Sequence, residues 1–267
     1  MSLRMLTLCA VAAGTVAAAL AQPALAQDAK DAPRRYRVAL GPQVLPSYPG
    51  ADGSRLRPLM DLDRARGDTP FPFEAPDESF GPGLLRTNGF EFGPAVGLDG
   101  RRTRGDTDDR LPRIRSAVEI GGFVNYQVAP AFRLRTEVRR GVRGHHGWIS
   151  TIGADYVTRD ADRWLFSLGP RVTLSDGRYN RTYFGISPAD AVAAGLPAYR
   201  PGAGLQALGG TAGLIRQFTP HWGIYAYAKY DRLVDDVGRS PVLAAFGSRN
   251  QISGGAALTY TFGKGMR

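Results

Sequence analysis

The feature that most constrains this chain is an alternation of period two in which charged side chains share one face. Its clearest example runs in the order Phe132, Arg133, Leu134, Arg135, Thr136, Glu137, Val138 and Arg139. Successive side chains of a β-strand point to opposite faces, so this order gives one apolar face and one ionic face. A solvated sheet face would explain a single strand of this kind. The same alternation returns along the chain, as from Trp164 to Leu174, and this favours strands with one face toward lipid.

The alternation predicts twelve strands. They cover residues 36–44, 54–62, 69–75, 82–87, 90–98, 115–126, 131–141, 147–158, 163–174, 204–218, 222–231 and 251–262. Most approach or exceed the roughly 9 to 11 residues that a tilted strand needs to cross a bilayer. The pattern is weakest in the third and fourth. An even total also leaves both chain ends on one side of the membrane. We therefore expect an all-β fold, a transmembrane antiparallel β-barrel of twelve strands over residues 36–262.

The connections between the predicted strands alternate in length. The short ones are 88–89, 127–130, 159–162 and 219–221, and the long ones are 99–114, 175–203 and 232–250. Outer-membrane barrels pair short periplasmic turns with longer external loops and carry aromatic girdles at the membrane boundaries. Aromatic residues gather at the predicted periplasmic strand ends, namely Tyr36, Phe90, Tyr126, Phe132, Tyr156, Trp164, Phe218, Trp222 and Phe262. Both features indicate the outer membrane of a Gram-negative bacterium.

The first 26 residues differ from the rest. Arg4 precedes an apolar run from Leu6 to Leu20, and Ala24-Leu25-Ala26 is a small-residue cleavage site. We predict a cleaved signal peptide over residues 1–26, a periplasmic segment over 27–35 and a C-terminal tail over 263–267. The only cysteine, Cys9, lies in the signal. The mature chain therefore has no disulfide and no thiolate metal site.

The mature chain is strongly basic. Its formal charge is +9, because the signal holds Arg4 and no acid and the whole chain carries +10. Clustered arginine often indicates nucleic-acid binding. Export argues against such a partner, and in the envelope a cationic surface or lumen would attract lipopolysaccharide, other polyanions and anionic solutes.

The ionic strand faces are predicted to line the barrel lumen. A basic side chain on the lipid face at mid-depth would cost about 2 to 4 kcal/mol. The candidate lumen residues, which could form a solute path, are Arg115, Glu119, Arg133, Arg135, Glu137, Arg139 and Arg171. Twelve strands lie between the roughly eight whose interior side chains can fill and the roughly sixteen that leave a channel. The sequence leaves open whether the lumen conducts.

One long connection carries a helix signal. Ser187 precedes Pro188, Asp190 lies in the first predicted turn, and Gly195 is a stop signal. We expect a short helix in this external loop. It either caps or enters the lumen, or lies solvated in the loop.

The chain offers little that could carry catalysis. His145 and His146 are adjacent in one turn, and neighbouring side chains of extended backbone point to opposite faces. We predict a solvated turn there, with no metal centre and no cofactor. The hydroxyl groups, that of Ser150 included, show no spacing that assembles a nucleophile, a base and an orienting group. An enzyme is therefore the least supported class of function.

Five short segments carry a family resemblance. They are Pro46-Ser47-Tyr48-Pro49-Gly50, Gly121-Gly122-Phe123-Val124-Asn125-Tyr126, Tyr183-Phe184-Gly185-Ile186-Ser187, Gly195-Leu196-Pro197-Ala198-Tyr199 and Gly247-Ser248-Arg249-Asn250-Gln251. Together they resemble the MipA/OmpV family of outer-membrane proteins, also called MltA-interacting proteins, from about Tyr36 to Phe262. The chain departs from such barrels in the residues that follow Phe262, where they commonly end.

The resemblance implies an outer-membrane barrel that acts as a scaffold linking a lytic transglycosylase, which is a murein hydrolase, to a peptidoglycan synthase. It transfers no catalytic residues. We expect this scaffold role. The alternative, which rests on the inward arginines, is a small pore for anionic solutes.

Overall fold

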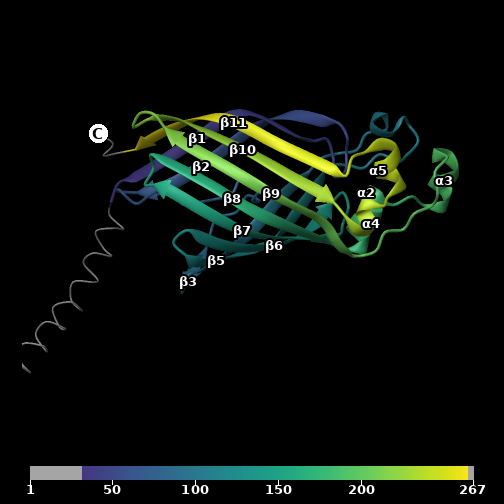
Figure 1. Ribbon diagram of the computed structural model, residues 1–267, viewed down its shortest axis with the longest axis horizontal. Coiled ribbons are helices and arrows are strands. Elements are labelled where there is room, and N and C mark those ends of the chain that lie inside the picture. The colour runs from purple at the N-terminus through teal and green to yellow at the C-terminus, as the bar shows by residue number, and fades with distance from the viewer. Residues whose placement is uncertain (1–31, 264–267) are drawn as a thin grey trace, which may run out of the picture.

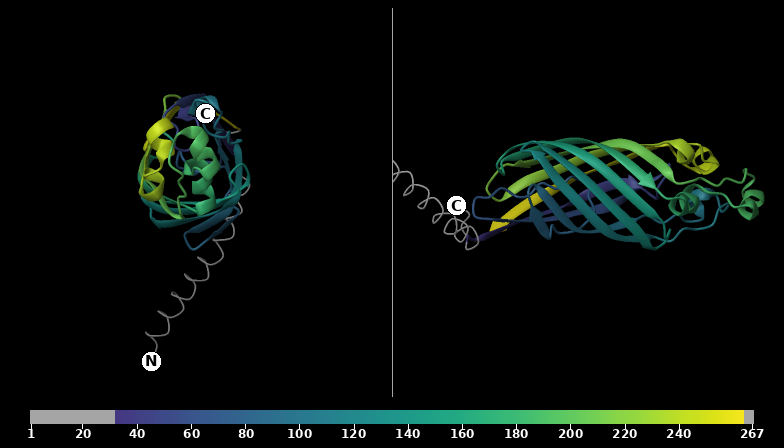
Figure 2. Two further views of the ribbon diagram at one scale, coloured as in Figure 1. Left: turned by 90° about the vertical axis from the view of Figure 1, so that its right-hand side faces the viewer. Right: turned by 90° about the horizontal axis from the view of Figure 1, so that it is seen from below.

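One curved antiparallel sheet makes up the body of the protein. The structure is a computed structural model and describes residues 32–263. Within this range eleven strands pair in the order β2-β1-β11-β10-β9-β8-β7-β6-β5-β4-β3. Their bounds are Arg34–Pro46 (β1), Ser54–Arg66 (β2), Leu85–Thr87 (β3), Phe90–Asp99 (β4), Ala117–Ala129 (β5), Phe132–Arg143 (β6), Trp148–Asp160 (β7), Trp164–Ser175 (β8), Gly204–Gln217 (β9), Trp222–Leu233 (β10) and Asn250–Gly263 (β11). The strands are tilted alike and curl around the long axis (Figures 1 and 2). The all-β barrel prediction is confirmed.

Helices lie at one end of the barrel. They are Gly105–Thr107 (η1, a 3₁₀ turn), Gly177–Phe184 (α2), Pro188–Ala194 (α3), Asp235–Gly238 (α4) and Pro241–Phe246 (α5). Seen from this end, α2 to α5 lie across the mouth of the barrel (Figure 2). No helix within residues 32–263 has the length and the apolar run that a membrane crossing requires.

The predicted helix after Ser187 is confirmed as α3. The Ser187 hydroxyl accepts a hydrogen bond from the Asp190 amide at 3.1 Å. Gly195 follows the helix with a φ of 62°, a left-handed conformation that glycine adopts without a side-chain penalty. The other helices of the end cap were not predicted, because they are too short to show a helical period.

The two faces of the strands differ as the alternation predicts. On β6, Leu134 is 47% exposed on the outer face, and its neighbour Arg135 is 7% exposed on the inner face. The exposed apolar residues continue along the outer face of β2 as Leu56, Met60 and Leu62. The sheet therefore has an apolar outside and a polar inside.

Aromatic pairs between neighbouring strands form the predicted girdle. The ring centroids are 5.7 Å apart for Tyr36 and Phe262, 4.4 Å for Phe90 and Tyr126, 5.3 Å for Phe132 and Tyr156, and 4.8 Å for Trp222 and Tyr260. Cross-strand aromatic pairs stabilise a sheet, and rings at this level suit a membrane boundary. The girdle marks the end opposite the helices, which is the predicted periplasmic end.

The prediction of twelve strands is wrong, because residues 69–75 form no strand. This stretch contains Pro70 and Pro72, and Pro76 follows it directly. Proline has no amide N–H and cannot donate to a ladder. Phe71, Phe73 and Ala75 alternate with period two, which is why the sequence predicts a strand here. The segment instead leaves the sheet and passes through the interior of the barrel.

The predicted strand over 82–87 is also shorter in the structure, where β3 covers only Leu85–Thr87. Ahead of it the chain makes an isolated bridge between Phe80 and Val96. The start of β1 and the end of β11 still lie at the same end of the barrel, since Arg35 pairs with Gly263. An odd number of strands would normally place the two chain ends on opposite sides of the membrane. Here residues 67–79 cross the barrel inside the lumen and take the place of one strand, so the two ends stay on the same side.

Of the predicted segments, the signal peptide over residues 1–26, residues 27–31 of the periplasmic segment and residues 264–267 of the tail lie outside the described residues. Arg34 and Arg35, at the end of the predicted periplasmic segment, already belong to β1.

Candidate functional site: the occupied lumen

Residues 67–79, here called the lumen segment, cross the interior of the barrel. Asp77 forms an ion pair with Arg171 of β8, with Nε and Oδ2 2.9 Å apart, and a longer one with Lys229 of β10 at 3.5 Å. Pro76 packs against Gly213 of β9, so that a β-carbon there would lie 3.0 Å from the proline ring. These contacts come from three neighbouring strands, and contacts from across the sheet come from Arg37 of β1, whose guanidinium lies over the Phe71 ring, and from Arg133 of β6. The lumen is therefore occupied by the chain itself.

Arg133 holds the middle of the lumen segment. Its guanidinium pairs with Glu78 of the segment and, at 2.8 Å, with Asp155 of β7. It also donates to the Phe73 carbonyl at 3.1 Å and lies over the Phe73 ring, 4.3 Å from its centroid. One side chain thus binds an acid, a carbonyl and an aromatic ring, and most of these groups belong to the segment.

Arg135 and Arg139 continue the same pattern toward the helical end. Arg135 pairs with Glu78 at 3.1 Å and with Glu137 at 2.5 Å. Arg139 pairs with Glu119 of β5 at 2.8 Å and also contacts Glu137 and the Ser79 hydroxyl. Glu137 accepts a hydrogen bond from Ser79 at 2.6 Å. The inner face of β6 is therefore bound to the end of the lumen segment.

Arg171 completes the set. Its Nη2 donates to Asp155 at 2.7 Å, and its Nε and Nη2 both donate to Asp77. Asp155 consequently joins Arg133 to Arg171 across β7. A buried ion pair offsets the cost of desolvation when its geometry is good and further hydrogen bonds support it, and the Asp155 carboxylate accepts one hydrogen bond from each of the two arginines.

Six of the seven predicted lumen residues lie on the inner face, and five of them, Glu119, Arg133, Arg135, Glu137 and Arg171, are fully buried. Arg139 lies with them, in contact with Glu119. Arg115 does not, because β5 begins only at Ala117 and Arg115 is an exposed residue of the preceding loop. The inward guanidinium groups are each paired with carboxylates, so they are not a row of free positive charges for a solute.

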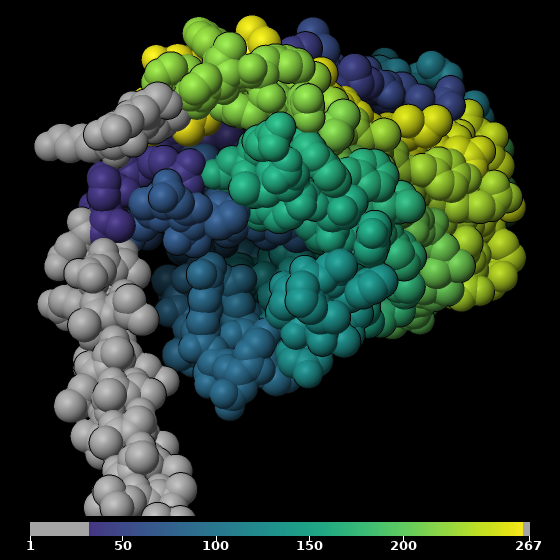
Figure 3. All heavy atoms as spheres, turned by 60° about the vertical axis from the view of Figure 1, so that its left-hand side comes forward, coloured from purple at the N-terminus to yellow at the C-terminus, as the bar shows by residue number. Residues whose placement is uncertain are grey.

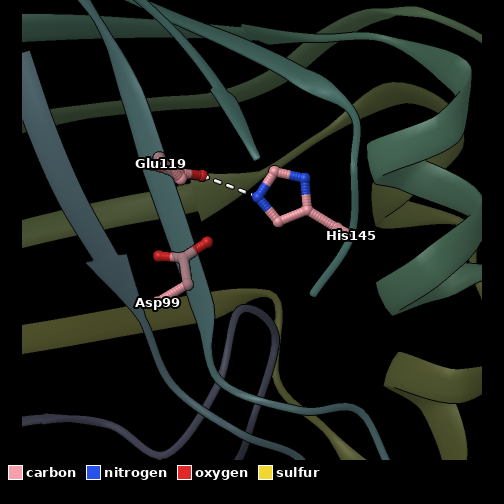
Figure 4. Close-up of side chains that lie close together, drawn as sticks. All are labelled: Asp99, Glu119 and His145. Carbon is pink, nitrogen blue, oxygen red and sulfur yellow. Dashed lines mark hydrogen bonds and ion pairs between the residues drawn. The ribbon is translucent and has the colours of Figure 1, made fainter. Parts of the chain in front are cut away.

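His145 contradicts the predicted solvated turn, since it is only 2% exposed. Its Nε2 lies 2.8 Å from Oε1 of Glu119, and the Gly147 amide donates to its Nδ1 at 3.0 Å. Figure 4 shows the imidazole facing the Glu119 carboxylate, with Asp99 beside them. The adjacent His146 is exposed, so one ring is buried and the other is not, but its φ of 55° is left-handed and not the extended backbone that the prediction assumed.

Asp99, Glu119 and His145 bring their donor atoms within 4.8 Å of one another, which is a spacing that a metal ion could use. The hydrogen bonds favour another role. Because the Gly147 amide donates to Nδ1, that atom carries no proton, and the neutral ring has its proton on Nε2, directed at Glu119. A metal at Nε2 would require the other tautomer. The cluster acts as a hydrogen-bond network, and Asp99 joins it to Tyr179 of α2, whose hydroxyl lies 3.1 Å away.

The helical end is closed by an apolar core. Tyr179, Tyr183 and Phe184 of α2 pack with Leu233, Val237 and Leu243, and other buried members of this core are Tyr48, Ala51, Ile114, Ile149 and Ala207. Burial raises the pKa of Tyr183, with smaller contributions from nearby acids, so its phenol stays neutral. A second core joins Leu111 to α3 and α5. The external mouth is therefore covered by packed side chains.

Several cavities remain around the lumen segment, and three of them are large enough to matter for binding. One of about 250 Å³ lies between the segment and the helical cap, with Asp77, Tyr179 and Lys229 in its lining. One of about 430 Å³ opens at the periplasmic end, between the segment and the turn at Asn88. One of about 160 Å³ lies beside β2.

Sequence reasoning missed the acids that pair with the arginines. Asp77 and Glu78 belong to a proline-rich stretch that does not repeat with period two, and their partners lie 55 or more residues away. A segment of alternating Pro and Phe followed by two acids is the one signal that could have suggested an internal segment rather than a strand.

One protein family and several solved structures are similar to this chain. The family described as MltA-interacting protein MipA matches residues 38–262. No curated protein matches the sequence. Among solved structures, the chain is similar to the COG4313 outer membrane channel from Pseudomonas putida F1, at 10% identity and a TM-score of 0.39 over 86% of this chain and 96% of that one. It is also similar to the N-terminal β-barrel domain of Pseudomonas aeruginosa OprF, at 14% identity and a TM-score of 0.30 over 65% and 96%.

Proposed function

The chain belongs to the MltA-interacting protein family, as the match over residues 38–262 shows, and from this premise we propose that it is a scaffold for peptidoglycan-remodelling enzymes. It is a β-barrel protein of the Gram-negative outer membrane. The partners that we propose are a lytic transglycosylase, which the family description suggests, and a peptidoglycan synthase. The family match is the observation that carries the proposal.

The occupied lumen supports a binding role over a transport role. The lumen segment is held by buried ion pairs at Arg133 and Arg171, and the helical cap closes the external end. In a barrel with a filled lumen, a partner would bind to the outer surfaces and not inside the lumen. Enzymes of the cell wall would meet it at the periplasmic end.

The periplasmic end presents a groove suited to such a partner. The cavity of about 430 Å³ there is lined by Phe73, Arg86, Asn88, Glu91 and Gln127 among others. Arg86 and Glu91 form an ion pair at 2.5 Å across the β3–β4 hairpin. Polar groups beside an aromatic ring are typical of transient protein interfaces. We propose this groove as the docking surface.

The alternative function, a small pore for anionic solutes, has less support. Its basis was the row of inward arginines, and Arg133, Arg135, Arg139 and Arg171 each pair with two or more carboxylates. A solute path would require the lumen segment to leave. We also propose that the chain is not an enzyme, because the contacts of His145 are to Glu119, Gly147 and aromatic rings, with no serine, threonine or cysteine for the imidazole to activate.

Two further proposals follow from the outer-membrane location. Residues 1–26 are removed on export, which mass spectrometry of the mature chain would test. The external surface lies against lipopolysaccharide, whose phosphates suit the basic charge of this chain.

Site-specific photo-cross-linking in intact envelopes tests the scaffold. A photoreactive residue at Asn88, in the periplasmic turn, should capture a lytic transglycosylase or a peptidoglycan synthase. The matched control is Val192 of α3, which is 87% exposed at the opposite end and should capture neither. Capture of no cell-wall enzyme from Asn88, or equal capture from both positions, would overturn the proposal.

A further inference from the structure

The barrel wall has a seam between β2 and the β3–β4 hairpin. These strands are the two edges of the sheet, and the described residues contain no ladder that joins them. The chain emerges from the lumen at this seam, where Phe80 exchanges two backbone hydrogen bonds with Val96 and the Leu84 amide donates to the Phe92 carbonyl. Figure 3 shows the surface hollowed between the blue part of the chain that follows β2 and the hairpin.

A cavity of about 160 Å³ passes through the wall at the seam. Two apolar residues of the outer surface, Met60 on one side and Phe80 on the other, contribute to its lining and are 70% and 81% exposed. The same cavity is lined from the inside by Leu165, Ile215 and Tyr225, which come from three other strands. It therefore connects the apolar exterior with the interior of the barrel.

The seam cavity lies in the part of the barrel wall that faces the periplasmic leaflet of the membrane. Asp61 in its lining pairs with Ala39 of β1, three residues along the strand from Tyr36 of the aromatic girdle. Three residues of strand span roughly 10 Å. A molecule in the periplasmic leaflet would thus meet the opening directly.

The charges in the cavity do not balance. Asp63 is held by Arg37 at 2.5 Å, and Glu78 by Arg133 and Arg135. Asp61 and Glu74 also line the cavity, and among residues 32–263 neither has a cationic group within 4 Å. A carboxylate that faces a hydrocarbon boundary is costly unless it is hydrated or paired with a cation. The lining therefore carries an excess of negative charge that a bound cation would neutralise.

We propose that the seam is a lateral binding site for cationic amphiphiles, molecules with a protonated amine and an apolar chain. The ammonium group would lie between Asp61 and Glu74. The chain would extend past Met60 and Phe80 into the lipid. This activity is distinct from the scaffold function, since the seam cavity lies in the wall and shares only Pro72 and Phe73 with the lining of the proposed docking groove.

The test uses the full mature protein in nanodiscs of zwitterionic lipid. A dansyl-labelled alkylamine is titrated and its fluorescence followed, beside the matching alkyl alcohol and alkyl carboxylate. The amine should bind saturably and the carboxylate should not. The double variant Asp61→Asn, Glu74→Gln should weaken amine binding at least about tenfold, the scale of about 1.4 kcal/mol. Asp109→Asn, which removes an exposed charge in an external loop, should leave it unchanged.

Blocking the opening gives a second measurement that does not alter the carboxylates. Met60→Cys provides a unique thiol in the mature chain, because the only natural cysteine is Cys9. A bulky maleimide on it should abolish amine binding, and the same label on Ile252→Cys, which is 68% exposed on β11, should not. Equal binding of the amine and the alcohol, with no loss in the double variant, would mean that the seam takes acyl chains only and would overturn the proposal.

Discussion

Asp77 and Arg171 form a bidentate ion pair, with Nε and Nη2 of Arg171 donating to Oδ2 and Oδ1 of Asp77 at 2.9 and 3.0 Å. The two residues are 94 positions apart in the sequence. The pair joins a proline-rich segment to the barrel wall, and both side chains are more than nine-tenths buried. It explains how an irregular stretch can lie at membrane depth, which is tolerated where the backbone is buried in protein.

Replacing Asp77 with alanine should destabilise the barrel by about 3 to 5 kcal/mol, because Arg171 would lose half of its carboxylate partners inside the lumen. Lys229 would lose a partner as well. Urea unfolding in lipid vesicles, followed by tryptophan fluorescence, measures the change. The control is Asp160→Ala, whose ion pair with Arg163 is largely exposed and should contribute about 0 to 1 kcal/mol. Equal effects of the two substitutions would contradict the buried pairing.

His145→Ala should cost about 1 to 3 kcal/mol, because the buried Glu119 carboxylate would lose one of its two hydrogen-bond partners. The neighbouring His146→Ala should stay within about 0.5 kcal/mol, as expected for a surface position. The same unfolding assay compares them, and a ratio near one would show that His145 is not held in the network.

Divalent metal ions should not stabilise the protein, because the Gly147 amide fixes the His145 proton on Nε2. Adding Zn²⁺ or Ni²⁺, or removing either with a chelator, should leave the unfolding midpoint unchanged in the wild type and in Asp99→Asn. A midpoint that rises with Zn²⁺ and loses this rise in Asp99→Asn would instead identify the cluster as a metal site.

The sequence predicts well which strand residues point into the lumen and which point outward, because side chains alternate between the two faces of a strand. Arg133, Arg135 and Glu137 point inward for no other reason than their order relative to Phe132 and Leu134. The girdle follows from the same argument, since the aromatic residues lie at strand ends. These parts of the fold are local properties of each strand.

The partners of the inward residues could not be predicted from the same pattern. Glu78 meets Arg133 only because Pro70 and Pro72 keep residues 69–75 out of the sheet and the lumen offers a cationic interior. His145 is buried because a loop folds back onto Glu119, 26 residues earlier. Both contacts depend on the three-dimensional path of irregular chain, which carries no repeat in the sequence.

The loop before β5 should loosen as the pH falls. Burial alone would raise the pKa of Asp106, but hydrogen bonds from Thr103 and the charge of Arg55 outweigh it and lower the pKa below 3.8. A lowered pKa in the folded state means that this carboxylate stabilises the loop above its unfolded pKa and stops doing so as the pH falls through the folded value. Hydrogen exchange of the Thr103 amide, which donates to Asp106 at 2.6 Å, measures the loss.

The matched variant for this loop is Asp106→Asn, whose Thr103 amide should show low protection, relative to its exchange rate in the unfolded chain, at every pH. An unchanged difference between wild type and variant from neutral pH down to pH values well below 3.8 would contradict the role of the carboxylate.

Removing both the lumen segment and helix α2 of the cap should convert the barrel into an anion channel. Replacing residues 70–79 and 177–184 with short flexible Gly-Ser linkers gives a shortened variant without the packing of Tyr179, Tyr183 and Phe184 that closes the helical end. The first replacement also takes Asp77 and Glu78 away from Arg133, Arg135 and Arg171, so positive charge would remain in an emptied lumen. In planar bilayers the wild type should show no steady conductance, because the segment and the helical cap close the path.

The shortened variant should conduct with a preference for anions, and Arg133→Gln, Arg135→Gln in the same background should reduce this preference, since the selectivity rests on these side chains. Heat-modified mobility in gels verifies that each variant still folds as a barrel. If the wild type already conducts anions as well as the shortened variant does, the ion pairs do not hold the segment in place and the pore function regains its support. If the shortened variant folds and stays closed, the remaining loops of the helical end, which pack around Leu111 and Val242, close the barrel without α2.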